Sequence, residues 1–321
     1  MSYELLETLR ADVEALTEPG ERVVGSKGHR AARAWLLERM QRLGLQPYGD
    51  AFEWPYGPRN SGQVNVLGRL PGRDPSLPPM LLAAHYDTCG RQPGADDNAA
   101  AIAISLSSVK PLRSARLERD VVFAFFDGEE PPRFLTPNMG STYFYRAQRK
   151  GPVHCAIVLD LCGHEVPIPG CGDLLFVTGM ESDPGLEPVI EAGAEVRGVR
   201  AVPLLTRYIG DLSDYHAFRL DQRPYLFLTC ARWEHYHMPT DTPDRLDYDK
   251  MAAIRNYVVA ATQRASAQAL SGPFEGYDTT PTEVAMVRRN MAPMLQQFGL
   301  EVQGREDIDQ MVSMAMRLFE V

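Results

Sequence analysis

Features that would define several classes of protein are scarce or missing in this sequence. The five cysteines are odd in number and none stands in a Cys-x-x-Cys pair, which argues against a disulfide framework or a thiolate zinc finger. No apolar run approaches the roughly 18 residues that would indicate a membrane span. The first residues, MSYELLETLRADVEALTEPG, have neither the basic nor the apolar region of a signal peptide. We therefore expect a cytoplasmic protein that does not enter a membrane.

Positive charge is also in short supply. The chain of 321 residues carries 42 acidic and 33 basic residues, a net charge of −9, and has no stripe of Lys or Arg. Such a balance lacks the electrostatic footprint of a nucleic-acid-binding protein and is not attracted to anionic lipid. Apolar residues make up 44% of the chain, enough for a globular protein with a large core.

Short and nearly continuous apolar runs alternate with segments of helical periodicity. Runs of this kind are typical of strands that are buried on both faces, and their alternation with helices predicts an α/β fold with a mostly parallel sheet. The runs are Met80–Ala84, Val121–Phe126, Ala156–Leu159, Leu174–Thr178 and Tyr225–Thr229. The expected helices cover residues 2–17, 28–44, 97–110, 140–149, 184–195, 213–220 and 248–270.

A break at Ser271-Gly272-Pro273 separates a C-terminal extension from the rest of the chain. We therefore divide the chain into a main domain over 1–272 and a helical extension over 273–321. Amphipathic patterns predict two helices in the extension, at 281–298 and 305–320. They could form an appendage that makes a homo-oligomer, or pack on the same domain.

Acidic residues and histidines follow the ends of the strand-like runs. His85 and Asp87 follow the first run, Asp127-Gly128-Glu129-Glu130 the second and Asp160 the third. His237 comes after the last run, and Asp97 lies where a helix opens. In an open α/β sheet, ligands bind at the carboxyl ends of the strands, so these groups should converge at one edge.

The converging side chains have the composition of a zinc site with nitrogen and oxygen ligands. Several carboxylates in one crevice repel each other unless cations neutralise them, which is a physical reason to expect metal. Two histidines and three carboxylates, one of them shared, fit a pair of ions. The candidate ligands are His85, Asp97, Glu130, Asp160 and His237.

Five motifs in this order resemble the co-catalytic zinc aminopeptidase family, which includes bacterial leucyl aminopeptidases, glutamate carboxypeptidases and glutaminyl cyclases. The resemblance covers about residues 26–260. It implies a three-layer α/β/α sandwich of the phosphorylase/hydrolase-like zinc exopeptidase type. The matching segments are AHYDT (84–88), GADDNAA (94–100), FDGEE (126–130), VLDLCG (158–163) and YHMPTDT (236–242).

The resemblance implies a role for each residue that matches a motif. His85 and Asp160 would hold one zinc, Glu130 and His237 the other, and Asp97 would bridge the two. Two zinc ions are expected and one is possible; cobalt or manganese could substitute.

Residues beside these ligands would assist them. The resemblance implies that Glu129 is the general base that takes a proton from water. Asp87, two residues from His85 on the same strand face, would orient its imidazole, and Asp241 would support His237 in the same way.

The function that follows is metal-dependent hydrolysis of N-terminal residues from peptides or small aminoacyl substrates. One alternative is a single-zinc glutaminyl-peptide cyclotransferase, because FDGEEPPRFLTPNMGS and Asp-Leu-Cys-Gly at 160–163 also resemble that branch. Asp214 could then be its acid, or merely start a helix. A second alternative is a non-catalytic binding module on a peptidase scaffold.

Other residues near the motifs have less specific interpretations. His235 competes with His237 as a ligand, and His216 is expected near the site without ligating. Tyr208 and Tyr236 are candidates to line a substrate pocket, as are Tyr215 and Trp233. Cys89 is interpreted as a plain loop thiol. The remaining histidines, His29, His154 and His164, are interpreted as structural or surface groups.

Overall fold

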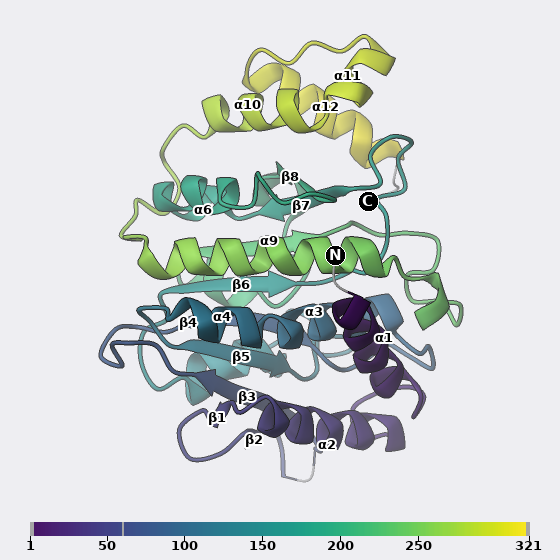
Figure 1. Cartoon of the computed structure of the whole chain (residues 1–321), viewed down its shortest axis with the longest axis vertical. Helices are drawn as coiled ribbons and strands as arrows, with labels where there is room; N and C mark the ends of the chain where they lie inside the picture. Colours follow the sequence, from purple (N-terminus) through teal and green to yellow (C-terminus); the bar gives the residue numbers. More distant parts are fainter. Residues whose placement is uncertain (1–2, 60, 319–321) are drawn as a thin grey trace.

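The computed structural model describes residues 3–59 and 61–318. Its centre is a mixed sheet with helices on both faces (Figure 1). The order of the strands across the sheet is β1-β3-β5-β4-β6-β9-β7-β8, with β2 also paired to β3. The strands are β1 (Gln46–Pro47), β2 (Glu53–Pro55), β3 (Val64–Leu70), β4 (Met80–His85), β5 (Val121–Phe126), β6 (Cys155–Leu159), β7 (Leu174–Thr178), β8 (Arg200–Pro203) and β9 (Tyr225–Thr229).

The four central strands, β5, β4, β6 and β9, run parallel to one another. All their residues are buried, as their continuous apolar sequences predict. Their shared direction brings their carboxyl ends to one edge, where His85 pairs with Phe126 and Leu159 with Leu228. The flanking strands β3 and β7 are antiparallel to their central neighbours. The predicted α/β fold with a mostly parallel sheet is confirmed.

Side chains that alternate along the central strands feed two separate cores. Leu82 and Ala84 of β4 belong to the larger core, and Leu81 and Ala83 to the smaller one on the other face. The larger core is covered by α1 (Tyr3–Thr17), α2 (Lys27–Arg42), α3 (Ala101–Ser107), α4 (Val109–Ala115), α6 (Glu187–Glu191) and α9 (Tyr248–Ala267). The smaller core is covered by the π-helical turn η2 (Phe144–Gln148) and α8 (His216–Leu220), and α7 (Thr206–Ile209) packs at its border. The short helix α5 (Gly140–Tyr143) precedes η2 and contacts both η2 and α8.

Short helical turns complete the connections around the sheet. They are η1 (Ala95–Ala100), η3 (Met180–Ser182), η4 (Pro184–Leu186) and η5 (Pro243–Arg245). Within the described ranges, every helix is too short or too polar to span a lipid bilayer.

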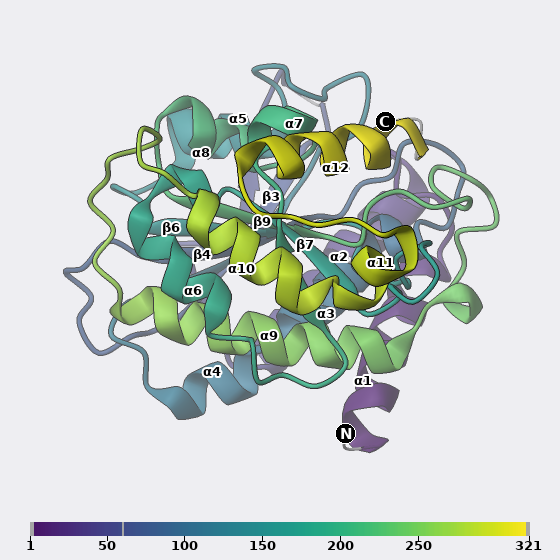
Figure 2. The same cartoon turned by 90° about the horizontal axis from the view of Figure 1, so that it is seen from above.

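The C-terminal extension forms three helices where the sequence predicts two. They are α10 (Thr280–Asn290), α11 (Ala292–Phe298) and α12 (Arg305–Leu318). The expected helix over 281–298 is interrupted at Met291, just before Pro293, which has no backbone N–H to continue a helix and is suited to start one. These helices lie over the β7–β8 end of the sheet (Figures 1 and 2).

Contacts tie the extension to the rest of the chain. The Asn290 side-chain amide donates to the Ala201 carbonyl on β8 at 2.6 Å. Val284, Val287 and Met291 are buried in the larger core. Of the two possibilities left open by the sequence, the structure therefore shows the extension packed on the same sheet.

Candidate metal centre

Asp97 lies between two histidines that are 152 positions apart in the sequence. Its Oδ1 is 3.2 Å from Nε2 of His85, at the end of β4, and its Oδ2 is 3.1 Å from Nε2 of His237. Each oxygen of one carboxylate therefore faces a different imidazole. This is the arrangement that a carboxylate shared by two ions requires.

Each histidine has a further carboxylate on its own side of Asp97. Asp160 Oδ1, which follows β6, is 3.5 Å from His85 Nε2. Glu130 Oε2, which follows β5, is 3.3 Å from His237 Nε2. The five predicted ligands thus come together as two sets that share Asp97. One nitrogen and two carboxylates in each set are ligands that zinc accepts.

The polar atoms at this centre fit a metal because they are left without protein partners. A buried donor or acceptor without a hydrogen bond is costly, and native proteins satisfy nearly all of them. Each of the five side chains nevertheless has one buried atom with no hydrogen-bond partner among the described residues. These atoms are His85 Nε2, Asp97 Oδ2, Glu130 Oε1, Asp160 Oδ1 and His237 Nε2.

The crowding of charge shifts the proton affinity of these groups. Burial, together with the nearby Asp97 carboxylate, raises the pKa of Glu130 to about 8. Burial alone would lower the pKa of His237, but the Asp97 and Glu130 carboxylates outweigh it and raise that pKa to about 9. Without metal, Glu130 and His237 therefore tend to stay protonated at neutral pH. Divalent cations would take the place of these protons and neutralise the same carboxylates.

Glu129 points into the centre beside the ligands. Its Oε2 is 3.8 Å from His85 Nε2, and the residue is only 4% exposed. Burial raises the pKa of Glu129 well above its usual value; His85 opposes the shift, while Asp160 and Glu130 add to it. A carboxylate with raised proton affinity next to metal ligands is suited to accept a proton from water.

Asp87 and Asp241 contact backbone amides more closely than they contact the histidines. The Asp87 oxygens accept the N–H groups of Glu129 and Glu130, each at 3.1 Å. The Asp87 carboxylate is 3.6 Å from His85 Nδ1, and the Asp87 carbonyl, at 3.3 Å, is nearer. Asp87 therefore positions the turn that carries Glu129 and Glu130.

Asp241 acts on the turn that carries the shared carboxylate. Its Oδ1 accepts the Asp96 N–H at 2.8 Å and its Oδ2 the Asp97 N–H at 3.1 Å. The hydrogen bonds that the structure gives the Asp241 side chain are thus with the backbones of Asp96 and Asp97, whereas the sequence suggested support for His237. Asp96 itself is turned away, because it accepts hydrogen bonds from the Gly163 N–H and from His164 Nδ1.

Sequence reasoning missed Arg22, a fully buried cation beneath this turn. Its guanidinium donates to the carbonyls of Tyr86 (2.7 Å) and Gly94 (2.9 Å), and to that of Pro93. Burial lowers the pKa of Arg22 to about 10, so the group stays charged at neutral pH and offsets part of the acidic charge nearby. No motif around Arg22 signals this role, because its partners are carbonyls 64 or more positions away.

The other residues that the sequence suggested near the site differ in how close they lie to the ligands. Tyr236 stacks on His237, with ring centroids 3.8 Å apart. His235 is turned to Thr240, 3.0 Å away. His216 is bound to Asp211 at 2.7 Å. Tyr208 donates to Asp309 and so ties α7 to α12.

Asp214 is buried completely beside the centre. Neither of its carboxylate oxygens has a hydrogen-bond partner within the described part of the chain. Burial raises the pKa of Asp214 to about 7, although His85 opposes the shift.

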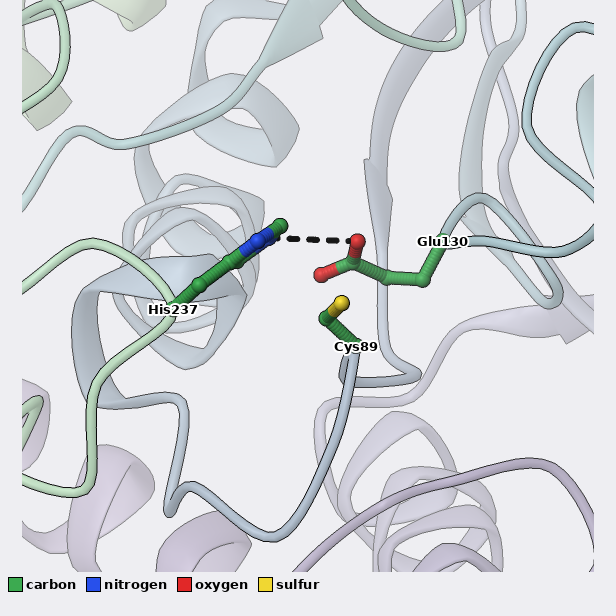
Figure 3. Close-up of side chains that lie close together, drawn as sticks. All are labelled: Cys89, Glu130 and His237. Atoms are coloured by element: carbon green, nitrogen blue, oxygen red, sulfur yellow. Dashed lines mark ion pairs between the residues drawn. The ribbon is translucent and has the colours of Figure 1, made fainter.

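The Cys89 thiol, which the sequence suggested was a plain loop thiol, lies beside two of the candidate metal ligands. Its sulfur, an oxygen of Glu130 and a ring nitrogen of His237 all lie within 4.8 Å of one another (Figure 3). The position of this thiol four residues after His85 is the one signal in the sequence that could have drawn attention to it.

A cavity of about 500 Å³ opens from the metal centre. Asp97, Glu129, Glu130, Asp160 and His237 form its polar end, together with Tyr236. The rest of the wall is mainly apolar and comes from β7, β8, β9, the C-terminal helices and several connecting loops.

The chain is similar in sequence or fold to several known proteins. The chain is 28% identical over 221 residues to the uncharacterized protein YfbL of Escherichia coli strain K12, a match that covers 57% of this chain and 65% of YfbL. LapB from Legionella pneumophila has the same fold, with a TM-score of 0.67 and 22% identity over 83% of this chain and 74% of LapB. A glutaminyl cyclase from Porphyromonas gingivalis has a TM-score of 0.63 and 18% identity over 80% of this chain and 97% of that one.

The sequence also matches a family model directly. The model of peptidase family M28 aligns with residues 65–262, which include all five converging ligands and Glu129. This protein is therefore a member of peptidase family M28.

Proposed function

We propose that this protein is a metal-dependent aminopeptidase that releases N-terminal residues from peptides. The observation that carries the proposal is the position of Asp97 between His85 and His237, with Glu129 facing the same centre. Membership of a peptidase family and the apolar cavity beside the ligands support a peptide substrate.

The residues divide the work of hydrolysis in this proposal. Zinc held by the five ligands would make water more acidic and polarise the scissile carbonyl. Glu129 takes the proton from the attacking water and returns it to the leaving amine. Asp87 keeps Glu129 in place through the Glu129 N–H, so that the carboxylate stays within reach of the water.

Cyclisation of an N-terminal glutamine is the alternative reaction. It would depend on a proton-carrying acid such as Asp214. Asp214 is buried completely and is not part of the cavity wall, whereas Glu129 is. This difference supports hydrolysis over cyclisation.

A panel of short peptides with alanine, leucine, phenylalanine or glutamine at the N-terminus separates the possibilities. Mass spectrometry of the products should show release of the first residue in the presence of zinc. Loss of ammonia from the glutamine peptide, with its peptide bond intact, would favour the cyclotransferase. No conversion of any peptide by protein with bound metal would favour the non-catalytic binding module.

Metal content is a separate measurement. Elemental analysis of the purified protein should give two zinc ions per chain, one for each histidine of the centre. A value of one would fit the single-zinc alternative. Cytoplasmic location and assembly through the C-terminal helices stay predictions.

A further inference from the structure

The C-terminal helices build one wall of the cavity that opens from the metal centre. Side chains from α10, α11, α12 and the residues that join these helices face it, and every one of these lining side chains is apolar. They include Val287, Met291, Met294, Ile308, Val312 and Ala315. These residues lie beyond residue 262, where the match to the family model ends. The wall therefore comes from residues outside the range that matches the family model.

The opposite wall is apolar as well. It comes from the strands next to the centre, with Phe176 on β7, Val202 on β8 and Phe227 on β9. The cavity thus has a polar end, where the ligands and Glu129 stand, and an apolar compartment between the sheet and the extension. A substrate that places its scissile bond at the polar end has its apolar part in this compartment.

The size of the cavity points to a large apolar group. The whole cavity, polar end included, measures about 500 Å³, and at about 30 Å³ for a group the size of a water molecule it would hold roughly 17 such groups. A leucine side chain has only four carbon atoms. Methionine side chains in the wall are flexible and can adapt to apolar groups of different shapes.

We propose that the C-terminal extension makes this protein selective for peptides whose first side chain is apolar and larger than leucine. The proposal rests on the proposed aminopeptidase function. Ala315 on α12 is the residue that tests it best, because it is small, half-buried and part of the wall.

The test compares full-length variants on substrates of increasing side-chain length. Ala315→Phe should fill part of the compartment and lower kcat/KM at least tenfold for a substrate that begins with 2-aminodecanoic acid, with less than a twofold change for one that begins with alanine. Ser313→Phe is the matched control, since Ser313 is exposed on the same helix outside the cavity wall. Equal losses on both substrates, or no loss, would overturn the proposal.

A binding measurement separates this proposal from the proposed function. Calorimetry with linear alkylamines should show affinity rising roughly fourfold per added methylene, the equivalent of about 0.8 kcal/mol, in the wild type but not in Ala315→Phe. Such binding without hydrolysis of any peptide would support the proposed apolar compartment and contradict the proposed aminopeptidase function. Hydrolysis of peptides without any dependence on the length of the alkyl chain would support the proposed aminopeptidase function and contradict the proposed compartment.

A second inference rests on Cys89 and does not depend on the reaction. Figure 3 shows its sulfur and the His237 ring both facing the Glu130 carboxylate. Glu130 is 4% exposed, and its Oε1 is buried with no hydrogen-bond partner in the described ranges. A carboxylate oxygen of Glu130, an imidazole nitrogen of His237 and the Cys89 sulfur lie within 4.8 Å of one another and form a set that can hold a cation.

The two sets of ligands differ once Cys89 is included. The His85 set has three protein ligands, which leaves a position open, as in catalytic zinc sites. The His237 set gains a fourth ligand, and four protein ligands are typical of closed zinc sites. A thiolate also favours zinc or cadmium over manganese and magnesium.

We infer that Cys89 would be a further ligand of the cation that His237 and Glu130 would hold, whereas the His85 set would keep three protein ligands. Reconstitution with cobalt tests this by absorption spectroscopy. The wild type should show a thiolate-to-cobalt charge-transfer band in the near ultraviolet, and Cys89→Ser should lose it. Cys171→Ser, which removes a buried cysteine outside the set, should retain the band.

Metal titration provides the second readout. Cys89→Ser should bind cadmium at least tenfold more weakly at one of two positions and unchanged at the other. A wild-type cobalt protein without the charge-transfer band, or a Cys89→Ser protein that keeps it, would overturn the inference.

Discussion

The Asp241 carboxylate holds Asp97 by its backbone, accepting the Asp97 N–H at 3.1 Å. The other oxygen of Asp241 accepts the Asp96 N–H at 2.8 Å. Asp87 does the same for the turn that carries Glu129 and Glu130. Two aspartates therefore fix the backbones of two turns. One turn carries Asp97, and the other carries Glu129 and Glu130. Because the turns are held by acceptors and not by the metal alone, their geometry should exist before metal binds.

Removal of Asp241 should destabilise the metal-free protein. Asp241→Ala leaves two buried amides without an acceptor, and each such loss costs about 1–3 kcal/mol. We expect the free energy of unfolding, measured with urea in the presence of a chelator, to fall by roughly 2–6 kcal/mol. Asp241→Asn, which keeps one acceptor oxygen, should lose less.

The control for this prediction is Asp244→Ala, which removes an exposed carboxylate three residues away. Asp244→Ala should change the free energy of unfolding by no more than about 0.5 kcal/mol, the usual range for surface positions. Equal stability of Asp241→Ala and Asp244→Ala would show that the two amides do not depend on Asp241.

Glu129→Gln should separate catalysis from metal binding. The variant keeps the shape of the side chain but cannot accept a proton, so turnover should fall at least ~100-fold, the usual scale of base catalysis. Zinc content by elemental analysis should stay near that of the wild type, because Glu129 belongs to neither set around Asp97. Turnover close to the wild-type value would remove Glu129 from its proposed role.

His237 and His235 offer a matched pair of substitutions. His237 faces Asp97 and Glu130, whereas His235 is turned to Thr240. His237→Ala should lower the bound metal and also the melting temperature at a fixed zinc concentration, since metal stabilises the folded state by mass action. His235→Ala should change neither quantity. The reverse pattern would assign the ligand to His235.

Asp214 should make stability depend on pH in a defined direction. Burial raises its pKa in the folded protein to about 7 from an ordinary value of 3.8. The folded state then binds the proton more tightly than the unfolded state, so stability is lost as pH rises from about 4 to about 7. Asp214→Asn carries no such proton and avoids this loss.

The comparison is made on metal-free protein by urea unfolding at several pH values. The stability of Asp214→Asn relative to the wild type should increase with pH across this window, by at most about 1.4 kcal/mol per unit. A difference that does not change between pH 4.5 and pH 7.5 would show that Asp214 is not buried as an isolated acid.

The sequence alone determined the central strands and the identity of the residues at their ends. Strands buried on both faces need apolar side chains at every position, so β4, β5, β6 and β9 are visible as continuous runs. Parallel strands end at the same edge, and this rule predicts the convergence of His85, Asp160 and the Glu129–Glu130 pair. Local patterns were sufficient here because the cause of each feature is local.

Only the tertiary structure decided what supports and encloses that centre. Arg22 and Asp241 bind backbone groups, which leave no trace in the choice of neighbouring residues. Whether the C-terminal helices stand apart or cover the cavity depends on where α10 meets β8, and amphipathic periodicity shows an apolar face without showing its partner. Such contacts join residues up to about 150 positions apart, and only the folded chain brings them together.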